Sequence, residues 1–151
     1  MKQYVKMALG ILFAQTLLIV GLNFIPAFSQ NSASIQKQGL QTKTLLQQVD
    51  LVRSSELNGK YQLQLVESIF EPGGYLGEHH HAGPGIRYVT FGEITSVSAG
   101  KSKVFKAGDS FYDSGDTVHE LYNKTNKMVR VLNFEVLPSG WKGASAIPVR
   151  H

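Results

Sequence analysis

Short runs in which apolar and polar residues alternate, separated by glycine-, proline- and aspartate-rich turns, restrict the fold of this chain more than any other feature. Residues 61–65 read YQLQL, and this period of two is typical of a strand with one buried face. Runs rich in β-branched and aromatic residues mark further strands at 86–91, 93–98 and 128–137. No stretch after Leu45 has helical spacing. Short strands at such intervals predict an all-β sandwich or barrel.

The N-terminal segment is predicted to be separate from that fold. Lys2 and Lys6 precede an apolar run over residues 7–28, which closes with small residues at positions 27 and 29. A charged start, an apolar middle and a small-residue exit are typical of a secretory signal peptide, here residues 1–29. An uncleaved membrane anchor is the alternative, since about 20 apolar residues span a bilayer. Both interpretations predict that the rest of the chain works outside the cytoplasm, periplasmic or secreted.

The remainder of the 151-residue chain divides into three parts, with one domain expected for this length. Residues 30–44 are rich in Gln, Ser, Asn and Lys without apolar periodicity, which predicts a flexible spacer. The strand-rich domain is predicted over residues 45–138, and residues 139–151 form a C-terminal extension. The chain has no cysteine, so the domain is held by its core without disulfides. Basic residues are scattered rather than clustered, which argues against nucleic acid as a partner.

Three consecutive histidines are the clearest chemical feature of the chain. Successive side chains of a strand point to opposite faces, so His79 and His81 share one face and His80 points to the other. Two imidazoles at this spacing can converge on one ion, but a firm site needs a partner from another strand. His119, which follows the acidic turn at 113–116, is the candidate partner.

Two glycine–histidine patterns around these residues resemble the paired motifs of the cupins. The first cupin motif has the form G-x5-H-x-H-x3,4-E-x6-G, and the second has the form G-x5-P-x-G-x2-H-x3-N. The matching positions are Gly73, His79, His81 and Gly92 in the first motif and Gly108, His119 and Asn123 in the second. The resemblance covers residues 45–138 and is closest to small type-2 cupins that read H-x-H-x-G-P, similar to quercetin-dioxygenase-like cupins. Two motifs separated by a strand-rich stretch are more specific than either alone.

This resemblance implies a double-stranded β-helix, the cupin or jelly-roll barrel, that closes around a metal. The implied ligands are His79, His81 and His119, which leave open coordination positions. Some cupin oxygenases use a three-histidine site, so the resemblance implies a divalent transition metal and, if the protein is an enzyme, an oxidoreductase of the dioxygenase type. Iron, manganese, nickel, copper and zinc all accept imidazole, and the sequence does not select among them. Small cupins also commonly pair as homodimers.

The chain departs from the cupin motifs at three positions. Gly85 stands where the family has a glutamate ligand, and Ser114 and Asp116 replace the proline and the glycine of the second motif. Without the glutamate, the charge of the metal would favour an anionic ligand or a bound hydroxide. Asp113 could supply a carboxylate from the next strand, although turn aspartates more often bind local backbone groups.

Arg87 is predicted to point inward, because it lies two residues from Gly85 on the same strand. A buried arginine needs a partner, and two interpretations stand equal. Arg87 forms a structural salt bridge to Asp113 or Glu67, or it is a fork that binds the carboxylate of an acidic or enolic substrate.

Further candidates for binding a small molecule are Tyr75, Phe91, Phe111, Asp113 and Asn123. The aromatic residues could line an apolar cavity or form plain core, and Asn123 could orient a ligand or cap its strand. Three function classes stay open: a metalloenzyme, a non-catalytic binder of small molecules, and a structural barrel that dimerises. A hydrolase built on Ser114, His119 and Asp116 is set aside, since no nucleophile elbow surrounds the serine.

Overall fold

The computed structural model describes residues 33–48 and 57–150, and this part of the chain is built from β-strands joined by turns. The strands are β1 (Lys37–Gln48), β2 (Tyr61–His81), β3 (Gly85–Phe91), β4 (Glu93–Ser98), β5 (Lys101–Lys106), β6 (Ser110–Asp113), β7 (His119–Tyr122), β8 (Val129–Pro138) and β9 (Ala146–Pro148). Within the described residues there is no helix long and apolar enough to cross a membrane. The predicted signal peptide, residues 1–29, lies outside them.

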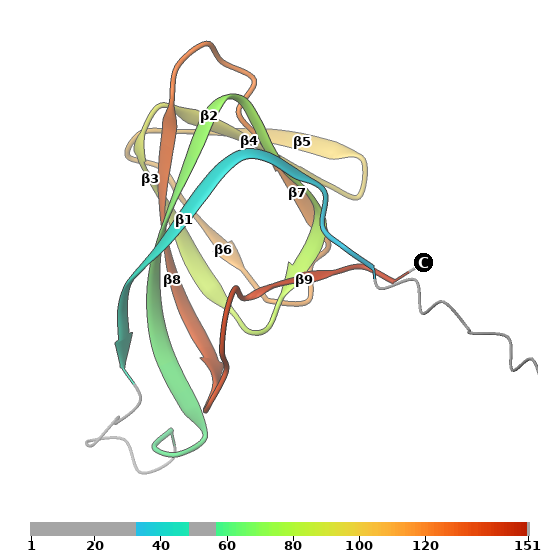
Figure 1. Cartoon of the computed structure of the whole chain (residues 1–151). Coiled ribbons are helices and arrows are strands. Elements are labelled where there is room, and N and C mark those ends of the chain that lie inside the picture. The colour runs from blue at the N-terminus through green and yellow to red at the C-terminus, as the bar shows by residue number, and fades with distance from the viewer. Residues whose placement is uncertain (1–32, 49–56, 151) are drawn as a thin grey trace, which may run out of the picture. The chain divides into compact units, whose positions relative to one another are not determined.

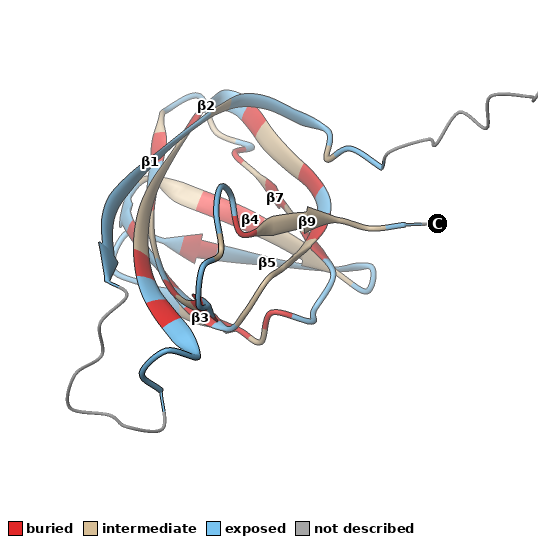
Figure 2. Ribbon diagram, turned by 60° about the horizontal axis from the view of Figure 1, so that its bottom comes forward, coloured by how far each residue is buried: buried red, intermediate tan, exposed pale blue. Residues whose placement is uncertain are grey.

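The long strand β2 connects the two halves of an antiparallel sheet. Its first half pairs with β8 over residues 61–70, and its second half pairs with β7 and β9 near the histidines. The strand order is β5-β4-β7-β2-β8-β3-β6, and β1 and β9 are added along β2. The strands curve around a common interior (Figure 1), and buried residues lie on strands all around it (Figure 2). The prediction of an all-β, double-stranded β-helix barrel is therefore confirmed.

Two irregularities in the strand pairing change which residues point inward. In β2 the register with β7 shifts between Leu76 and His79, so the inward residues are even-numbered before the shift and odd-numbered after it. In β3 the register with β8 shifts between Val89 and Phe91, and Phe91 is exposed. Both are β-bulges, which add a residue to one strand and re-aim the side chains that follow.

Strand β1 corrects the prediction of a flexible spacer over residues 30–44. Residues 37–44 belong to β1, which pairs with β2 along its length. Its polar composition concealed the strand, because nearly all of its side chains are exposed and only Leu40 packs against the core. Main-chain hydrogen bonds to β2 satisfy the backbone of such a strand without the apolar alternation that a buried face requires.

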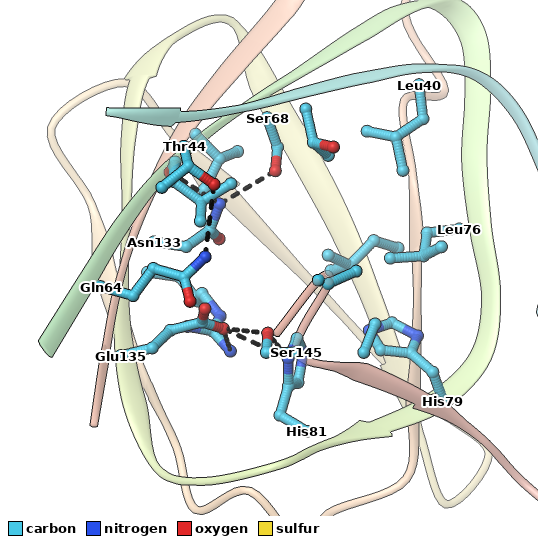
Figure 3. Close-up of a pocket in the computed structure, with 18 of the residues that line it drawn as sticks. Leu40, Thr44, Gln64, Ser68, Leu76, His79, His81, Asn133, Glu135 and Ser145 are labelled. Atoms are coloured by element: carbon cyan, nitrogen blue, oxygen red, sulfur yellow. Dashed lines mark hydrogen bonds and ion pairs between the residues drawn. The ribbon is translucent and has the colours of Figure 1, made fainter. Parts of the chain in front are cut away.

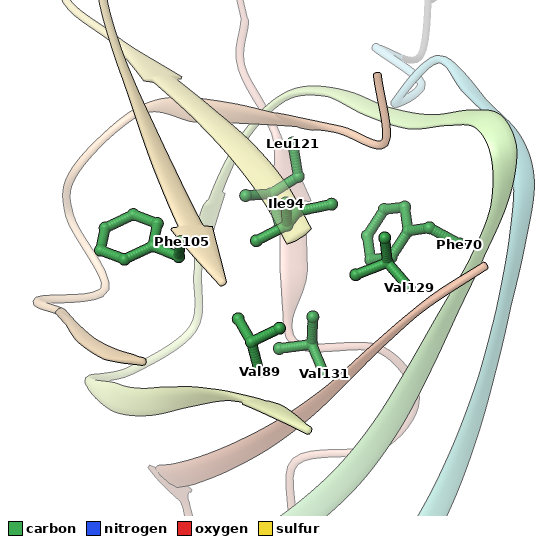
Figure 4. Packing of buried hydrophobic residues seen from close by; sticks show 7 residues of the cluster. All are labelled: Phe70, Val89, Ile94, Phe105, Leu121, Val129 and Val131. Carbon is green, nitrogen blue, oxygen red and sulfur yellow. The ribbon is translucent and has the colours of Figure 1, made fainter. Parts of the chain in front are cut away.

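The hydrophobic core ties both halves of the sheet together (Figure 4). Its seven buried residues come from six strands and are Phe70, Val89, Ile94, Phe105, Leu121, Val129 and Val131. Leu40, Leu76 and Phe111 pack against this cluster while remaining partly exposed. The core thus fills one region of the interior and leaves another region open for the cavity described below.

Replacing Phe70 with alanine is expected to lower the free energy of unfolding by about 3–5 kcal/mol, because the side chain is 1% exposed and a cavity would remain. Urea denaturation measures this loss. Phe91→Ala is the matched control, since Phe91 is 50% exposed, and its loss should stay below about 1 kcal/mol. Equal losses in the two variants would contradict this description of the core.

Candidate metal centre

A cavity of about 330 Å³ lies inside the barrel (Figure 3). Its apolar lining continues the core and includes Val66, Phe70, Leu76, Leu121 and Val131. Its uncharged polar lining includes Thr42, Thr44, Gln64, Ser68 and Asn133. The groups that can carry charge are His79, His81, Arg87 and Glu135. The C-terminal residues 141 and 143–146 also contribute to the wall.

The three predicted ligands lie together beside this cavity. His79 and His81 lie on β2, and His119 on β7 is directly paired with His79. The ring centroids are 4.3 Å apart for His79 and His119, 4.9 Å for His79 and His81, and 5.4 Å for His81 and His119. One nitrogen from each ring lies within 4.8 Å of the other two. The spacing predicted from strand geometry thus brings the imidazoles to one point.

Two of the rings are fixed by backbone carbonyl groups. Nδ1 of His79 lies 2.7 Å from the carbonyl oxygen of Gly77, and Nδ1 of His119 lies 3.0 Å from that of Thr117. A carbonyl oxygen only accepts hydrogen bonds, so each ring carries a proton on Nδ1 and donates it. In a neutral ring the lone pair is then on Nε2.

The third ring is fixed by two side chains from the C-terminal part of the chain. The hydroxyl of Ser145 donates to Oε1 of Glu135 at 2.5 Å. A serine has one hydrogen to donate, so Nδ1 of His81 is the donor in its 3.0 Å contact with Ser145 Oγ. Figure 3 shows this chain of contacts from Glu135 through Ser145 to His81. All three rings therefore present Nε2 to the interior in the same way.

The three Nε2 atoms have no hydrogen-bond partner. In the described ranges, these atoms and Nη1 of Arg87 are the buried side-chain nitrogen and oxygen atoms that lack one. An unpaired buried polar group costs about 1–3 kcal/mol, so the cluster does not serve the stability of the fold. Imidazole nitrogens oriented by a second hydrogen bond are the usual protein ligands of transition metals. The residues present therefore fit a metal held by His79, His81 and His119.

Burial keeps two of the rings neutral. Removal from water, reinforced by the neighbouring His119, lowers the pKa of His79 to about 3. Burial likewise lowers the pKa of His119 below its usual value. The neutral ring is the form that binds a metal, so an ion does not have to displace a proton from either ring near neutral pH.

Arg87 forms the salt bridge that one of the two interpretations predicted. Its Nη2 lies 3.1 Å from Oδ2 of Asp113 and 3.1 Å from Oε1 of Glu135, and all three side chains are buried. Glu67, the other predicted partner, pairs instead with Arg130. Both carboxylates contact Nη2, whereas Nη1 has no hydrogen-bond partner and Arg87 lines the cavity, so binding of an acidic ligand stays a prediction.

Both carboxylates are held in the ionised form. Burial alone would raise the pKa of Asp113, but the N–H of Gly115, the neighbouring His81 and the charge of Arg87 offset it, and the pKa is lowered. The pKa of Glu135 is lowered for similar reasons, with burial opposed by His81 and Arg87. One arginine against two carboxylates leaves a net negative charge beside the unpaired Nε2 atoms. This charge favours a bound cation.

Glu135 and Ser145 are site residues that the sequence interpretation missed. Glu135 could have been found from the sequence, because it is a charged residue at an inward position of the strand over residues 129–137. The other buried inward side chains of this strand are apolar. Ser145 carried no such signal. It reaches the site because β9, within the C-terminal extension, pairs with β2 at His79 and its two successors.

Two aromatic candidates for ligand binding lie outside the cavity. Tyr75 stacks on Tyr122 with centroids 6.0 Å apart, and Leu76 faces the cavity in its place. Phe91 is turned outward. In each case a β-bulge interrupts the alternation of inward and outward side chains along the strand.

The other two candidates have structural contacts. Phe111 packs against the core and stacks on Phe105 with centroids 4.2 Å apart, so it belongs to the core. Asn123 is 1% exposed and donates to the carbonyl oxygens of Phe70 and Lys127, among others, while its Oδ1 accepts from Thr125. Asn123 therefore connects a turn to the sheet, which agrees with the second of its two predicted roles, that of capping its strand.

Comparison with known proteins places this architecture in a family. The model of a family described as the cupin domain matches residues 66–135, which include both histidine motifs. Comparison with curated proteins found no match.

Solved structures with the same fold agree with this match. A protein of Klebsiella pneumoniae subsp. pneumoniae MGH 78578 with a double-stranded β-helix domain is 18% identical, with a TM-score of 0.55 over 74% of this chain and 85% of that one. A cupin superfamily protein of Desulfitobacterium hafniense DCB-2 is 13% identical, with a TM-score of 0.51 over 68% and 81%. KdgF from Halomonas sp. is 21% identical, with a TM-score of 0.50 over 66% and 84%. Residues 66–135 are therefore identified as a cupin domain, and the described part of the chain has the cupin fold.

Proposed function

We propose that this cupin is an exported metalloprotein that binds a divalent transition metal through His79, His81 and His119 and acts as a dioxygenase-type oxidoreductase on a small molecule. The observation that carries the proposal is the convergence of three unpaired Nε2 atoms beside an internal cavity. A cavity of about 330 Å³ is within the usual size range of small-molecule sites. The signal-peptide pattern of residues 1–29 supports export.

The cavity lining supports a ligand that has both apolar and hydroxyl surface. Asn133 donates from Nδ2 to the carbonyl oxygen of Val66 at 3.1 Å and to Ser68 Oγ at 2.9 Å. Both amide hydrogens are thus used, and Oδ1 is what Asn133 offers to a ligand, as an acceptor for a hydroxyl group. Phe70 and Val131 exclude water from the apolar side. A bound metal would supply Lewis-acid chemistry or activate dioxygen there.

The protein purified without a histidine tag is expected to contain near-stoichiometric metal after reconstitution with iron, manganese, nickel, copper or zinc. His79→Ala and His119→Ala should each lose it, because two imidazoles are too few for a firm site. Elemental analysis by mass spectrometry measures the content. His80→Ala is the matched control and should retain the metal, since the Nε2 atoms of its two neighbours converge without it.

A wild-type protein that takes up none of the five metals would contradict the proposal. Loss of metal in His80→Ala to the same degree as in the other two variants would indicate nonspecific binding to consecutive histidines.

Oxygen uptake separates the enzyme from a non-catalytic binder. The metal-loaded protein is expected to consume dioxygen when mixed with small acids or diphenols, and His119→Ala should not. An oxygen electrode records the rate. Metal binding together with saturable ligand binding but no oxygen uptake would instead favour the binder, in which the metal only anchors the ligand.

An apolar outer face supports the further proposal of a homodimer. Exposed apolar side chains cross five neighbouring strands and line a groove of about 440 Å³; they are Leu46, Leu63, Ile86, Tyr112 and Phe134. Exposed apolar patches of this kind mark interaction surfaces. A second copy is the partner we propose, because an uncharged apolar face is complementary to itself in a two-fold interface.

Phe134→Glu is expected to convert such a dimer to a monomer, because a buried charge would face its own copy across the two-fold axis. Light scattering coupled to size exclusion gives the mass. Val104→Glu is the control, since Val104 is comparably exposed on β5, away from this groove. A monomeric wild type would contradict the dimer and leave the metal site unaffected.

A further inference from the structure

We propose that Asp113 is the carboxylate ligand of the metal and takes over from the glutamate that this chain lacks at position 85. The inference rests on the proposed function, because it assumes that the three histidines hold a metal. It adds a protein ligand from a different strand, β6, so that the site would consist of three imidazoles and one aspartate.

Position 85 has no room for a side chain. A Cβ atom on Gly85 would lie 2.5 Å from Nη1 of Arg87 and 2.5 Å from the carbonyl oxygen of Phe134. The second contact is with backbone, so a side-chain rotation would not relieve it. The guanidinium group of Arg87 thus fills the space into which a ligand from position 85 would extend.

The register of the sheet places a carboxylate on each side of this glycine. Gly85 is directly paired with Asp113 on β6 and with Glu135 on β8. Directly paired residues of neighbouring strands project to the same face, with Cβ atoms about 4.5–5.5 Å apart. Both carboxylates therefore point into the interior from strands adjacent to position 85, and both are buried.

The contacts of the two carboxylates distinguish their roles. Oδ2 of Asp113 lies 3.4 Å from Nε2 of His81 and 3.7 Å from Nε2 of His119, the atoms that would bind the metal. Oε1 of Glu135 lies 3.4 Å from Nδ1 of His81, at the opposite edge of the ring. Two donor atoms that bind one ion at about 2.0–2.2 Å are about 3.0–3.6 Å apart. The distance of Asp113 Oδ2 from His81 Nε2 lies in this range and that from His119 Nε2, 3.7 Å, is just above it, so Asp113 can reach an ion at the histidines. Glu135 contacts the other edge of the His81 ring and supports it.

The other contacts of Asp113 orient its carboxylate toward the histidines. Oδ1 accepts a hydrogen bond from the N–H of Gly115 at 2.9 Å, which is the local backbone role expected of a turn aspartate. Nη2 of Arg87 donates to Oδ2 at 3.1 Å. An ionised carboxylate oxygen has more than one acceptor site, so Oδ2 can accept from Arg87 and still bind an ion. Arg87 then acts as a positioning residue for the ligand.

Cobalt binding to the full-length expressed protein tests this assignment. Affinity for Co²⁺ is measured by chelator competition, and the visible absorption of Co²⁺ reports its ligands. Glu135→Gln removes the same charge from the same arginine, and should weaken Co²⁺ binding by about tenfold, as loss of an outer support does. Asp113→Asn should weaken it at least tenfold more and alter the Co²⁺ absorption bands.

A double variant, Asp113→Asn with Arg87→Gln, distinguishes two reasons for weaker binding in Asp113→Asn: loss of a metal ligand, or loss of a charge partner of the buried Arg87. A lost ligand predicts that affinity stays low in the double variant, whereas recovery to the wild-type level would overturn the proposal. If Asp113→Asn does not fold, a Zn²⁺-loaded crystal structure of the wild type decides, with Oδ2 expected about 2.0–2.2 Å from the ion. A distance beyond about 3 Å would overturn the proposal even though the histidines bind. A wild type that binds no metal would overturn the proposed function and this inference together.

Discussion

The site depends on the β-bulge in β2 between Leu76 and His79. Before it, the inward side chains of the strand belong to the apolar core and the cavity wall, and after it the alternation is offset by one so that His79 and His81 point inward. One strand can therefore contribute both to packing and to a metal centre. The paired strand β7 brings His119 opposite His79 at the same place. Without the extra residue, the histidines of β2 would project to the other face of the sheet.

The buried charges around the histidines are costly to the stability of the fold. Arg87, Asp113 and Glu135 leave water together, and the cost of desolvating three charges is only partly returned by their mutual attraction. The three unpaired Nε2 atoms add a further cost. A metal ion held by the three histidines would complete this cluster and offset part of that cost.

The strands and the common face of His79 and His81 could be predicted from local patterns, whereas the closed barrel and the ligand set with His119 were implied by the resemblance to cupins. Period-two alternation marks the strands, and the spacing of His79 and His81 determines their common face. The positions of Tyr75 and Phe91 could not be predicted, because a β-bulge leaves no mark in the residue types and inverts the parity that follows it. Strand β1 could not be predicted because its side chains are polar and almost all exposed. Ser145 could not be predicted because it precedes β9, a strand of three residues that carry no pattern. Of the two carboxylate partners of Arg87, the sequence analysis considered Asp113 but not Glu135, which lies on β8.

The contact of Ser145 with His81 links the segment before β9 to the candidate metal centre. Ser145 precedes β9, which pairs with β2 at the histidines, so residues 146–148 are docked against the strand that carries two of the candidate ligands. Free-energy coupling between two equilibria is reciprocal: if docking of the C-terminal segment favours metal binding by orienting His81, a bound metal favours docking by the same factor. A metal bound at the three histidines would thereby protect the main-chain hydrogen bonds between β9 and β2 from exchange with solvent.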